Sequence, residues 1–404
     1  MRILFSTIGS RGDVQPVVAL ALHLKALAHD VRVCVPPDFR EWIESLGIPV
    51  TPIGPEVRRF AASRPPATQP LTAGVRRQMA EATVATQFET LTAAAQDCDV
   101  IVAATALQLA ARSVAEKLGI AYVFAAYTPI VLPSRHHAPP PLPPLPGQAP
   151  STASDNTELW ARDAARFNDL FGAAVNARRA SLGLAEISDV QSHMMTDRPW
   201  LAADATLAPW PDQADSGVFQ TGAWIMPDKR PLSRDLEKFL ASGDQPIYFG
   251  FGSTRAPEAA GPAMVDAARA LGCRAIVSQG WFDDSLVENE PDCLSIGEVN
   301  VHALFPRVAA VVHHGGAGTT TAAALAGAPQ VVFPSHYDQH YWAQRVHTLG
   351  IGTAHAPGEP TRDSLAGALA QSLRREIVAR ARELSGAVRR DGTSIAAERL
   401  LAFA

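Results

Sequence analysis

Residues 3–13 read ILFSTIGSRGD, a short apolar run followed by a Gly/Ser-rich loop at the beginning of a helical pattern. Residues 247–257 read IYFGFGSTRAP and repeat this order in the second half of the chain. Short, almost continuously apolar runs are typical of strands that are buried on both faces of a parallel sheet. Two such strand, loop and helix units, one in each half of the chain, favour two doubly wound α/β domains over one long sheet.

The rest of the chain continues this alternation of apolar runs with helical patterns. Helical patterns occupy residues 17–28 and 261–271. Strands are expected at residues 3–8, 31–35, 100–104, 121–125, 247–251, 275–278, 310–313 and 330–333. Repeated strand, helix, strand order predicts parallel sheets with right-handed crossovers.

The expected domain boundary lies where proline and glycine punctuate the chain, between residues 205 and 240. We therefore expect an N-terminal domain at 1–215, a linker at 216–235 and a C-terminal domain at 236–380. The charged helical pattern at the end of the chain predicts a C-terminal helix at 381–404 that packs back toward the N-terminal domain.

The composition argues against several classes of protein. Among 404 residues, 35 are basic and 40 acidic, and this net charge of −5 does not suit a general binder of nucleic acid or anionic membranes. The four cysteines form no CxxC pair, which argues against a zinc ribbon or disulfide scaffold and favours a reducing, cytoplasmic location. No signal peptide is expected, and the longest uncharged run, residues 308–337, contains histidines, glycines and prolines, so no membrane insertion is expected.

The first candidate site is GSRGD at residues 9–13, at the carboxyl end of the first expected strand. Ligands of open α/β sheets bind in this crevice. The sequence is not GxGxxG, so the dinucleotide fingerprint is absent. Arg11 can meet a phosphate or a carboxylate. Asp13 falls in the first turn of the next helix, where it is either a helix cap or a catalytic group.

The second candidate site is HHGGAGTT at residues 313–320, between an expected strand and an Ala-rich helix. A helix dipole and free backbone N–H groups at such a turn favour a pyrophosphate, to which His313 can donate a hydrogen bond. The lysine of a Walker motif is missing, and adjacent histidines do not easily bind one zinc ion. A purely structural Gly-rich turn is the alternative interpretation.

The third candidate site is the adjacent pair Asp338 and Gln339, in PSHYDQHYWAQRV at residues 334–346. Such a pair at a loop tip can hydrogen-bond the vicinal hydroxyls of a sugar.

Weaker candidates follow other expected strands. Ser253 and Thr254 can touch a phosphate, and Gln279 and Trp281 follow the next strand. Trp281 either covers a nucleobase or packs against the protein. The Pro-rich segment at 133–150 is expected to be an extended surface loop, with or without a role as a lid beside a substrate cleft, and an SH3-type ligand is the alternative.

Four of these motifs occur together in one order: GSRGDVQP at 9–16, FGST at 251–254, HHGGAGT at 313–319 and DQHYWAQRV at 338–346. In this combination the chain resembles the bacterial natural-product glycosyltransferases that act on glycopeptide and macrolide antibiotics, and it is similar to the sterol glucosyltransferases. The resemblance covers nearly the whole chain. It implies the GT-B fold, in which two Rossmann-like α/β domains face each other across a cleft, with the acceptor on the N-terminal domain and the nucleotide sugar on the C-terminal domain.

The resemblance also implies roles for individual residues. Asp13 corresponds to the general base, Ser10 and Arg11 lie near the diphosphate, and Gly12 is the loop glycine. Asp338 and Gln339 correspond to contacts of the donor sugar. The donor diphosphate falls on Ser253, His313, Gly315, Gly316, Ala317, Gly318 and Thr319.

Two departures from the family pattern limit what the resemblance implies. The sequence SHYDQHYW differs from the commoner QGSDQPYF-like sequence around the Asp-Gln pair, so the resemblance does not assign the identity of the donor sugar. The Pro-rich segment falls where the family varies most, so the acceptor stays open too.

The expected activity is therefore an inverting, metal-independent transfer of a hexose from a TDP- or UDP-sugar to a hydroxyl of a hydrophobic aglycone. No cofactor is expected beyond this co-substrate, and the oligomeric state is not readable. The alternatives are a sterol or lipid glucosyltransferase, a nucleotide-sugar epimerase or hydrolase, and a non-catalytic GT-B auxiliary protein.

Overall fold

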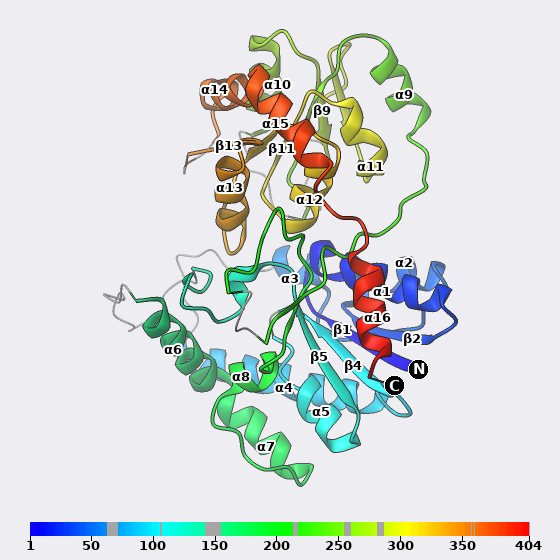
Figure 1. Cartoon of the computed structure of the whole chain (residues 1–404), viewed down its shortest axis with the longest axis vertical. Coiled ribbons are helices and arrows are strands. Elements are labelled where there is room, and N and C mark those ends of the chain that lie inside the picture. The colour runs from blue at the N-terminus through cyan, green and yellow to red at the C-terminus, as the bar shows by residue number, and fades with distance from the viewer. Residues whose placement is uncertain are drawn as a thin grey trace. The chain divides into compact units, whose positions relative to one another are not determined.

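The computed structural model describes residues 1–62, 72–105, 107–141, 155–212, 217–253, 260–280, 287–356, 358 and 360–403. The chain folds into two compact units (Figure 1). Unit 1 consists of Met1–Ala203, Pro209–Met226 and Arg390–Ala404. Unit 2 consists of Asp204–Ala208 and Pro227–Arg389, so the end of the chain returns to unit 1.

The sheet of unit 1 has seven strands in the order β3-β2-β1-β4-β5-β6-β7. Every pair of neighbouring strands is parallel. The strands are β1 (Arg2–Thr7), β2 (Asp30–Val35), β3 (Val50–Pro52), β4 (Val100–Ala104), β5 (Ala121–Ala126), β6 (Trp200–Leu201) and β7 (Phe219–Gln220).

Helices cover this sheet and bury its apolar side chains. Leu4 and Ile101 of the sheet pack with Val84, Val114 and Val175 from three helices. The helices of unit 1 are α1 (Arg11–Ala26), α2 (Arg40–Ser45), α3 (Val57–Ala62), α4 (Ala73–Ala94), α5 (Ala111–Leu118), α6 (Asn156–Phe167), α7 (Ala173–Ser181), α8 (Val190–Met195) and α16 (Gly392–Leu401).

The sheet of unit 2 has six strands in the order β10-β9-β8-β11-β12-β13, again all parallel. Neighbouring residues of a strand point to opposite faces, and Phe249 and Tyr248 accordingly enter two different apolar clusters. The strands are β8 (Ile247–Gly250), β9 (Ala275–Ser278), β10 (Cys293–Ile296), β11 (Ala310–His313), β12 (Gln330–Val332) and β13 (Gly352–Ala354).

The helices of unit 2 lie on both faces of its sheet. Met264 and Leu369 cover one face, and Leu236, Leu304 and Ala323 cover the other. The helices are α9 (Arg234–Ala241), α10 (Ala260–Ala270), α11 (Val301–Leu304), α12 (Ala317–Leu325), α13 (Gln339–Thr348), α14 (Arg362–Ser372) and α15 (Arg375–Ser385). Across the described helices of both units, none combines the length and the apolar character that crossing a bilayer requires.

The two parallel sheets confirm the predicted fold class. The strands expected at 100–104, 275–278 and 310–313 have the expected bounds. The strand expected at 3–8 is shifted by one residue to Arg2–Thr7, and the other expected strands differ by one residue at one end. The first helix begins at Arg11, six residues before the start of the helical pattern at residue 17. Ser10 explains the difference, because it caps the helix ahead of the apolar positions.

The terminal segment forms two helices where the sequence suggests one. Helix α15 ends at Ser385, and α16 begins at Gly392 and lies against α1 in unit 1. A Cβ at Gly392 would overlap the backbone of Gly222 and Ala223. Glycine at this position therefore allows α16 to approach the backbone that follows β7.

Each sheet has one point where the sequence order of its strands reverses. This point lies between β1 and β4 in unit 1, and between β8 and β11 in unit 2. Ligands of open α/β sheets bind beside the carboxyl ends of the strands at such a switch point. The loops that carry GSRGD and HHGGAGT follow β1 and β11, so each lies at the switch point of its own unit.

Candidate active site

Asp13 is held by the residue that precedes its helix. The backbone N–H and the hydroxyl of Ser10 donate to Asp13 Oδ2 at 2.6 and 3.1 Å. The carboxylate therefore caps the first turn of α1. Both hydrogen bonds from Ser10 end on Oδ2, so this oxygen is fixed, and Oδ1 accepts from neither of them.

Gly9 makes room for this carboxylate. Its φ is +148°, a conformation that favours glycine, and a Cβ at this position would overlap Asp13 Oδ2. The position of the Asp13 carboxylate thus requires a glycine at residue 9, in the loop between β1 and α1.

The environment of Asp13 changes its acid strength. Burial raises the pKa of the Asp13 carboxyl to about 6, although the hydrogen bonds from Ser10 oppose the rise. A carboxylate with this pKa is a stronger base than an ordinary aspartate and is still mostly ionised at pH 7. Asp13 therefore has the properties of a general base.

Arg11 and Gly12, the two residues before Asp13 in the motif, are not among the hydrogen-bond partners that hold its carboxylate. The guanidinium of Arg11 lies over the ring of Trp42 at 3.5 Å, and its Nε donates to Gln15 Oε1 at 2.9 Å. Gly12 is exposed. The structure thus brings Ser10 to Asp13 and holds Arg11 on Trp42, and the contacts of these residues with a diphosphate stay predictions.

In unit 2, the predicted donor-binding loops follow three adjacent strands. His313, at the end of β11, is in register with Gly250 of β8 and with Val332 of β12. The loops after these strands contain Ser253, the turn that begins at His313, and the pair Asp338 and Gln339. They therefore meet at one edge of the sheet.

The turn at residues 313–316, here called the glycine turn, leads into a helix whose N-terminus has no side-chain cap. Gly316 is the residue before α12, and no side chain of the described residues caps this end. The first turn of α12, which includes Gly318 and Thr319, contains no acidic residue. The free N–H groups and the helix dipole at this end suit an anion.

His313 supports the turn from within the unit. Its side chain is fully buried, the N–H of Gly315 donates to its Nδ1 at 3.1 Å, and its Nε2 donates to Gln330 Oε1 at 2.9 Å. Burial lowers the pKa of His313 to about 4, so the ring is neutral. Both ring nitrogens are thus engaged, which makes His313 a support of the turn in this geometry.

His314 is the residue at this turn whose role the sequence did not indicate. Its buried Nδ1 has no hydrogen-bond partner among the described residues. A Cβ at Gly316 would come within 2.5 Å of its Nε2, and a Cβ at Gly252 within 3.3 Å of its Cε1, so the ring fills space that two glycines leave. Burial, helped by His313 and His336, lowers the pKa of His314 to about 3. In the sequence, two adjacent histidines indicate that a ring lies at this turn, but they do not indicate which of the two rings forms hydrogen bonds within the protein.

The pair Asp338 and Gln339 shapes the loop after β12. Gln339 is buried, and its Oε1 accepts hydrogen bonds from the N–H and hydroxyl of Ser335 and from the N–H of His336. Asp338 Oδ2 accepts a hydrogen bond from Trp342 Nε1 at 3.2 Å. Both side chains order this loop, and their contacts with a sugar stay predictions.

The remaining donor-site candidates are only partly described. Gln279 follows β9, and its Nε2 donates to Ser295 Oγ at 3.3 Å. Thr254 and Trp281 lie outside the described residues.

The Pro-rich segment is described up to residue 141. The ring of His137 packs edge-on against Trp160 and Trp210, and Trp160 Nε1 donates to the carbonyl of His137. This anchors the beginning of the segment in unit 1, and the lid role stays a prediction because residues 142–150 lie outside the described residues.

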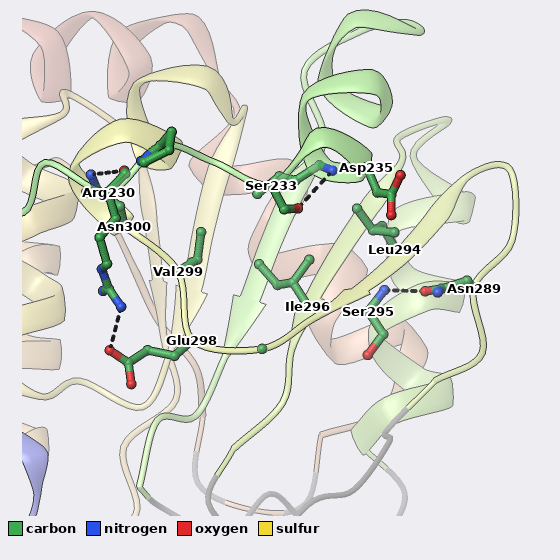
Figure 2. Close-up of a pocket in the computed structure, with 13 residues that line it drawn as sticks. Arg230, Ser233, Asp235, Asn289, Leu294, Ser295, Ile296, Glu298, Val299 and Asn300 are labelled. Atoms are coloured by element: carbon green, nitrogen blue, oxygen red, sulfur yellow. Dashed lines mark hydrogen bonds and ion pairs between the residues drawn. The ribbon is translucent and has the colours of Figure 1, made fainter. Parts of the chain in front are cut away.

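Figure 2 shows a pocket of unit 2 beside the edge strand β10. Polar groups of its lining bind within the pocket: Arg230 pairs with Glu298, and Asn289 Oδ1 accepts from the backbone N–H of Ser295. The pocket contains none of the predicted site residues. Its lining residues are Arg230, Pro231, Ser233, Asp235, Leu236, Asn289, Leu294, Ser295, Ile296, Gly297, Glu298, Val299 and Asn300.

The Asp97-Cys98-Asp99 triplet matches the DxD pattern of a metal site. The carboxylate of Asp99 accepts hydrogen bonds from the N–H and the guanidinium of Arg2 at 2.7 and 3.0 Å. This ion pair explains the triplet as a structural turn before β4. In the part of the chain that the structure describes, no group of three His, Cys, Asp or Glu side chains is placed to hold one metal ion.

Two protein families match the chain, one in each half. Residues 3–133 match the family described as "Glycosyltransferase family 28 N-terminal domain". Residues 264–394 match the family described as "Erythromycin biosynthesis protein CIII-like, C-terminal domain".

Curated relatives match over the full length. The glycosyltransferase GtfE of Amycolatopsis orientalis is 46% identical over 405 residues, covering 100% of this chain and 97% of the relative. The vancomycin aglycone glucosyltransferase of the same organism is also 46% identical over 405 residues, covering 99% and 97%. The dTDP-epi-vancosaminyltransferase of that organism is 42% identical over 389 residues, covering 94% and 92%.

Solved structures share the fold. The glycosyltransferase of kitacinnamycin superposes with a TM-score of 0.74 at 20% identity, covering 100% of this chain and 98% of the other. The glycosyltransferase VinC, solved in complex with dTDP, superposes with a TM-score of 0.68 at 18% identity, covering 100% and 99%. These neighbours place the two parallel sheets in the GT-B fold.

Proposed function

The chain belongs to the glycosyltransferases of antibiotic biosynthesis, and on this basis we propose that it glycosylates a hydroxyl of a glycopeptide-type aglycone by direct inversion. The donor is a hexose linked to TDP or UDP. Asp13 carries the proposal, because a half-buried carboxylate with a pKa of about 6 lies at the switch point of unit 1. Neither a metal ion nor a cofactor takes part.

The proposed reaction is a single displacement at the anomeric carbon. The acceptor oxygen forms a bond to the anomeric carbon as its proton moves to Asp13. The bond from that carbon to the diphosphate oxygen breaks, and its electron pair leaves with the nucleoside diphosphate. A positioned general base contributes typically about 10²- to 10⁴-fold to such a step.

Helix α12 supplies the stabilisation of the leaving group. Its N-terminus has no side-chain cap, so its backbone N–H groups and the positive end of the helix dipole are free to bind the diphosphate that we propose there. His314 adds its unpartnered Nδ1 as a neutral donor. These donors and the helix dipole stabilise negative charge, as a metal ion would otherwise do, which supports the metal-independent part of the proposal.

The substrates are proposed from relatives and from the surface of unit 1. A relative at 46% identity is named for the vancomycin aglycone, and another at 42% for a dTDP-sugar. Val75 and Met79 are each 41% exposed at the beginning of α4, which suits an acceptor with apolar groups. The four free thiols suit the reducing conditions of the cytoplasm, where we place the reaction.

A panel of nucleotide sugars tests the function. The true donor is expected to raise the Tm, because a ligand at 100 times its Kd adds roughly 2.7 kcal/mol of stability. An acceptor screen with that donor follows, with the anomeric configuration of the product read by NMR. Turnover of the donor without an acceptor would favour an epimerase or hydrolase, and a retained configuration would contradict inversion.

We predict that transfer depends on pH through Asp13. A proton acceptor must be ionised, so kcat/KM is expected to rise with pH through a midpoint near 6, the pKa of the buried carboxyl. The measurement is a pH profile of kcat/KM for the acceptor at saturating donor, which reports the carboxyl before the acceptor binds. A profile without an acid limb between pH 5 and pH 7 would exclude Asp13 as the base.

We predict different effects for the two histidines. His314→Ala is expected to weaken TDP binding by about tenfold or more, as for loss of a hydrogen bond to a charged group, and to lower the Tm less than His313→Ala does. His313→Ala is expected to lower both TDP affinity and Tm, because it leaves Gln330 and Gly315 without their buried partner. Calorimetry with TDP and thermal unfolding measure the two effects. Unchanged TDP affinity in His314→Ala would remove His314 from the donor site.

A further inference from the structure

The backbone carbonyl of Asp13 accepts hydrogen bonds from two side chains outside α1. The hydroxyl of Tyr127, which directly follows β5, donates to it at 3.1 Å. The hydroxyl of Thr7, at the end of β1, donates to it at 3.5 Å. The peptide of Asp13 is therefore tied to the ends of two strands of unit 1, in addition to the bonds that hold its carboxylate.

The first turn of α1 lacks one of its regular hydrogen bonds, so these two bonds from outside the helix matter for its position. In a regular helix the carbonyl of residue 12 accepts a hydrogen bond from the N–H of residue 16. Residue 16 is a proline inside α1 and has no N–H, so this bond is missing. Gly12, within the same turn, adds backbone freedom. The turn that carries Asp13 is consequently weaker than an ordinary helical turn.

Tyr127 is itself held firmly. Its ring packs edge-on against Trp224, with the ring centres 6.1 Å apart. Trp224 is 4% exposed, and its Nε1 donates to Thr221 Oγ1 at 3.0 Å. Burial, with a smaller contribution from the charge of Asp13, raises the pKa of Tyr127 well above its ordinary value, so the hydroxyl stays a donor at neutral pH.

We propose that Tyr127 is a positioning residue whose hydroxyl holds the first turn of α1 at the end of β5 and so fixes the Asp13 carboxylate. The inference rests on the proposed role of Asp13 as base. A displacement of about 1 Å at a reacting group can cost about 10²-fold in rate. Loss of one tie, with Ser10 still holding the carboxylate, is expected to cost less.

Tyr127→Phe tests the proposal with a matched control in the same unit. The hydroxyl of Tyr122, in β5, donates to the carbonyl of Met194 at 2.8 Å. Both Tyr→Phe changes thus remove one hydroxyl that donates to a backbone carbonyl. We expect Tyr127→Phe to lower kcat about tenfold with unchanged donor KM, while Tyr122→Phe keeps the wild-type kcat. Their Tm values are expected to fall by similar amounts.

The pH profile of kcat gives a second readout. A loosened turn lets water reach the carboxyl of Asp13, so its pKa moves from about 6 toward its ordinary value. The acid limb of Tyr127→Phe is therefore expected at lower pH than in the wild-type protein. The acid limb of Tyr122→Phe is expected to stay in place.

A double variant separates this proposal from the proposed function. If Tyr127 acts through Asp13, Tyr127→Phe has no further effect in the Asp13→Asn background. A full additional loss there, or equal kcat and pH profiles for Tyr127→Phe and Tyr122→Phe, overturns the positioning role. A fully active Asp13→Asn overturns the proposed function instead. If Tyr127→Phe does not fold, Thr7→Val replaces it, with a smaller drop in kcat expected and an unchanged kcat as the contradicting result.

Discussion

Asp13→Asn is expected to lower the rate of glycosyl transfer at least about 100-fold, the lower end of what a positioned general base contributes. The amide still accepts a hydrogen bond from the N–H of Ser10, but it cannot take a proton from the acceptor. TDP affinity is expected to stay unchanged, because the carboxylate of Asp13 is not among the proposed contacts of the diphosphate. Single-turnover transfer and calorimetry with TDP measure the two quantities.

The stability of this variant gives an independent check. The folded-state pKa of Asp13 is raised, so the stabilisation from its bound proton is complete below the ordinary value of 3.8 and is lost as the pH rises through about 6. At pH 7 the ionised carboxylate therefore carries a cost that Asn does not, and the Tm of Asp13→Asn is expected to equal or exceed that of the wild-type protein.

Asp99→Asn is the matched control for this variant. This carboxylate is exposed and paired with Arg2 in the same unit, so its loss is expected to leave transfer unchanged. Wild-type transfer by Asp13→Asn, or an equal loss in both variants, would contradict the role of Asp13 as base.

The sequence predicts the central strands well because they are buried on both faces. Residues 100–104 and 310–313 are almost entirely apolar, and they form β4 and β11 as expected. The edge strand β10 escapes prediction because three of its four residues are partly exposed and Ser295 interrupts the apolar run. Strands β6 and β7 have two residues each, too few to show a pattern.

The motifs predict which loops meet, since loops after adjacent parallel strands share one edge of a sheet. They do not predict which side-chain atoms form hydrogen bonds within the protein and which have none. His313 and His314 are neighbours in sequence, yet one ring is fixed by Gln330 and Gly315 and the other has an unpartnered nitrogen. The difference depends on β12 and on the loop after β8, which only the fold brings to this turn. The tie between Tyr127 and Asp13 spans 114 residues and is hidden from the sequence for the same reason.

Gly315→Ala is expected to abolish most donor binding. Gly315 has a φ of +93°, and a Cβ there would lie 2.7 Å from Val332 Cγ1 and 3.0 Å from the carbonyl oxygen of Gln339. The backbone strain costs about 1–3 kcal/mol and the overpacking a similar amount. Because the turn relieves this strain by moving, its N–H groups leave the diphosphate, and we expect TDP affinity to fall about 30-fold or more, which corresponds to 2 kcal/mol. The same strain is expected to lower the Tm by roughly 2–4 °C per kcal/mol.

Gly367→Ala provides the control, because the two glycines differ in what surrounds them. Gly367 lies in α14, and a Cβ there would meet no atom within 4 Å. Alanine is favoured over glycine inside a helix by roughly 0.5–1 kcal/mol, so this variant is expected to have a slightly raised Tm and unchanged TDP affinity. Calorimetry with TDP and thermal unfolding of both variants decide the matter. If Gly315→Ala binds TDP as the wild-type protein does, the glycine turn before α12 is not where the diphosphate binds.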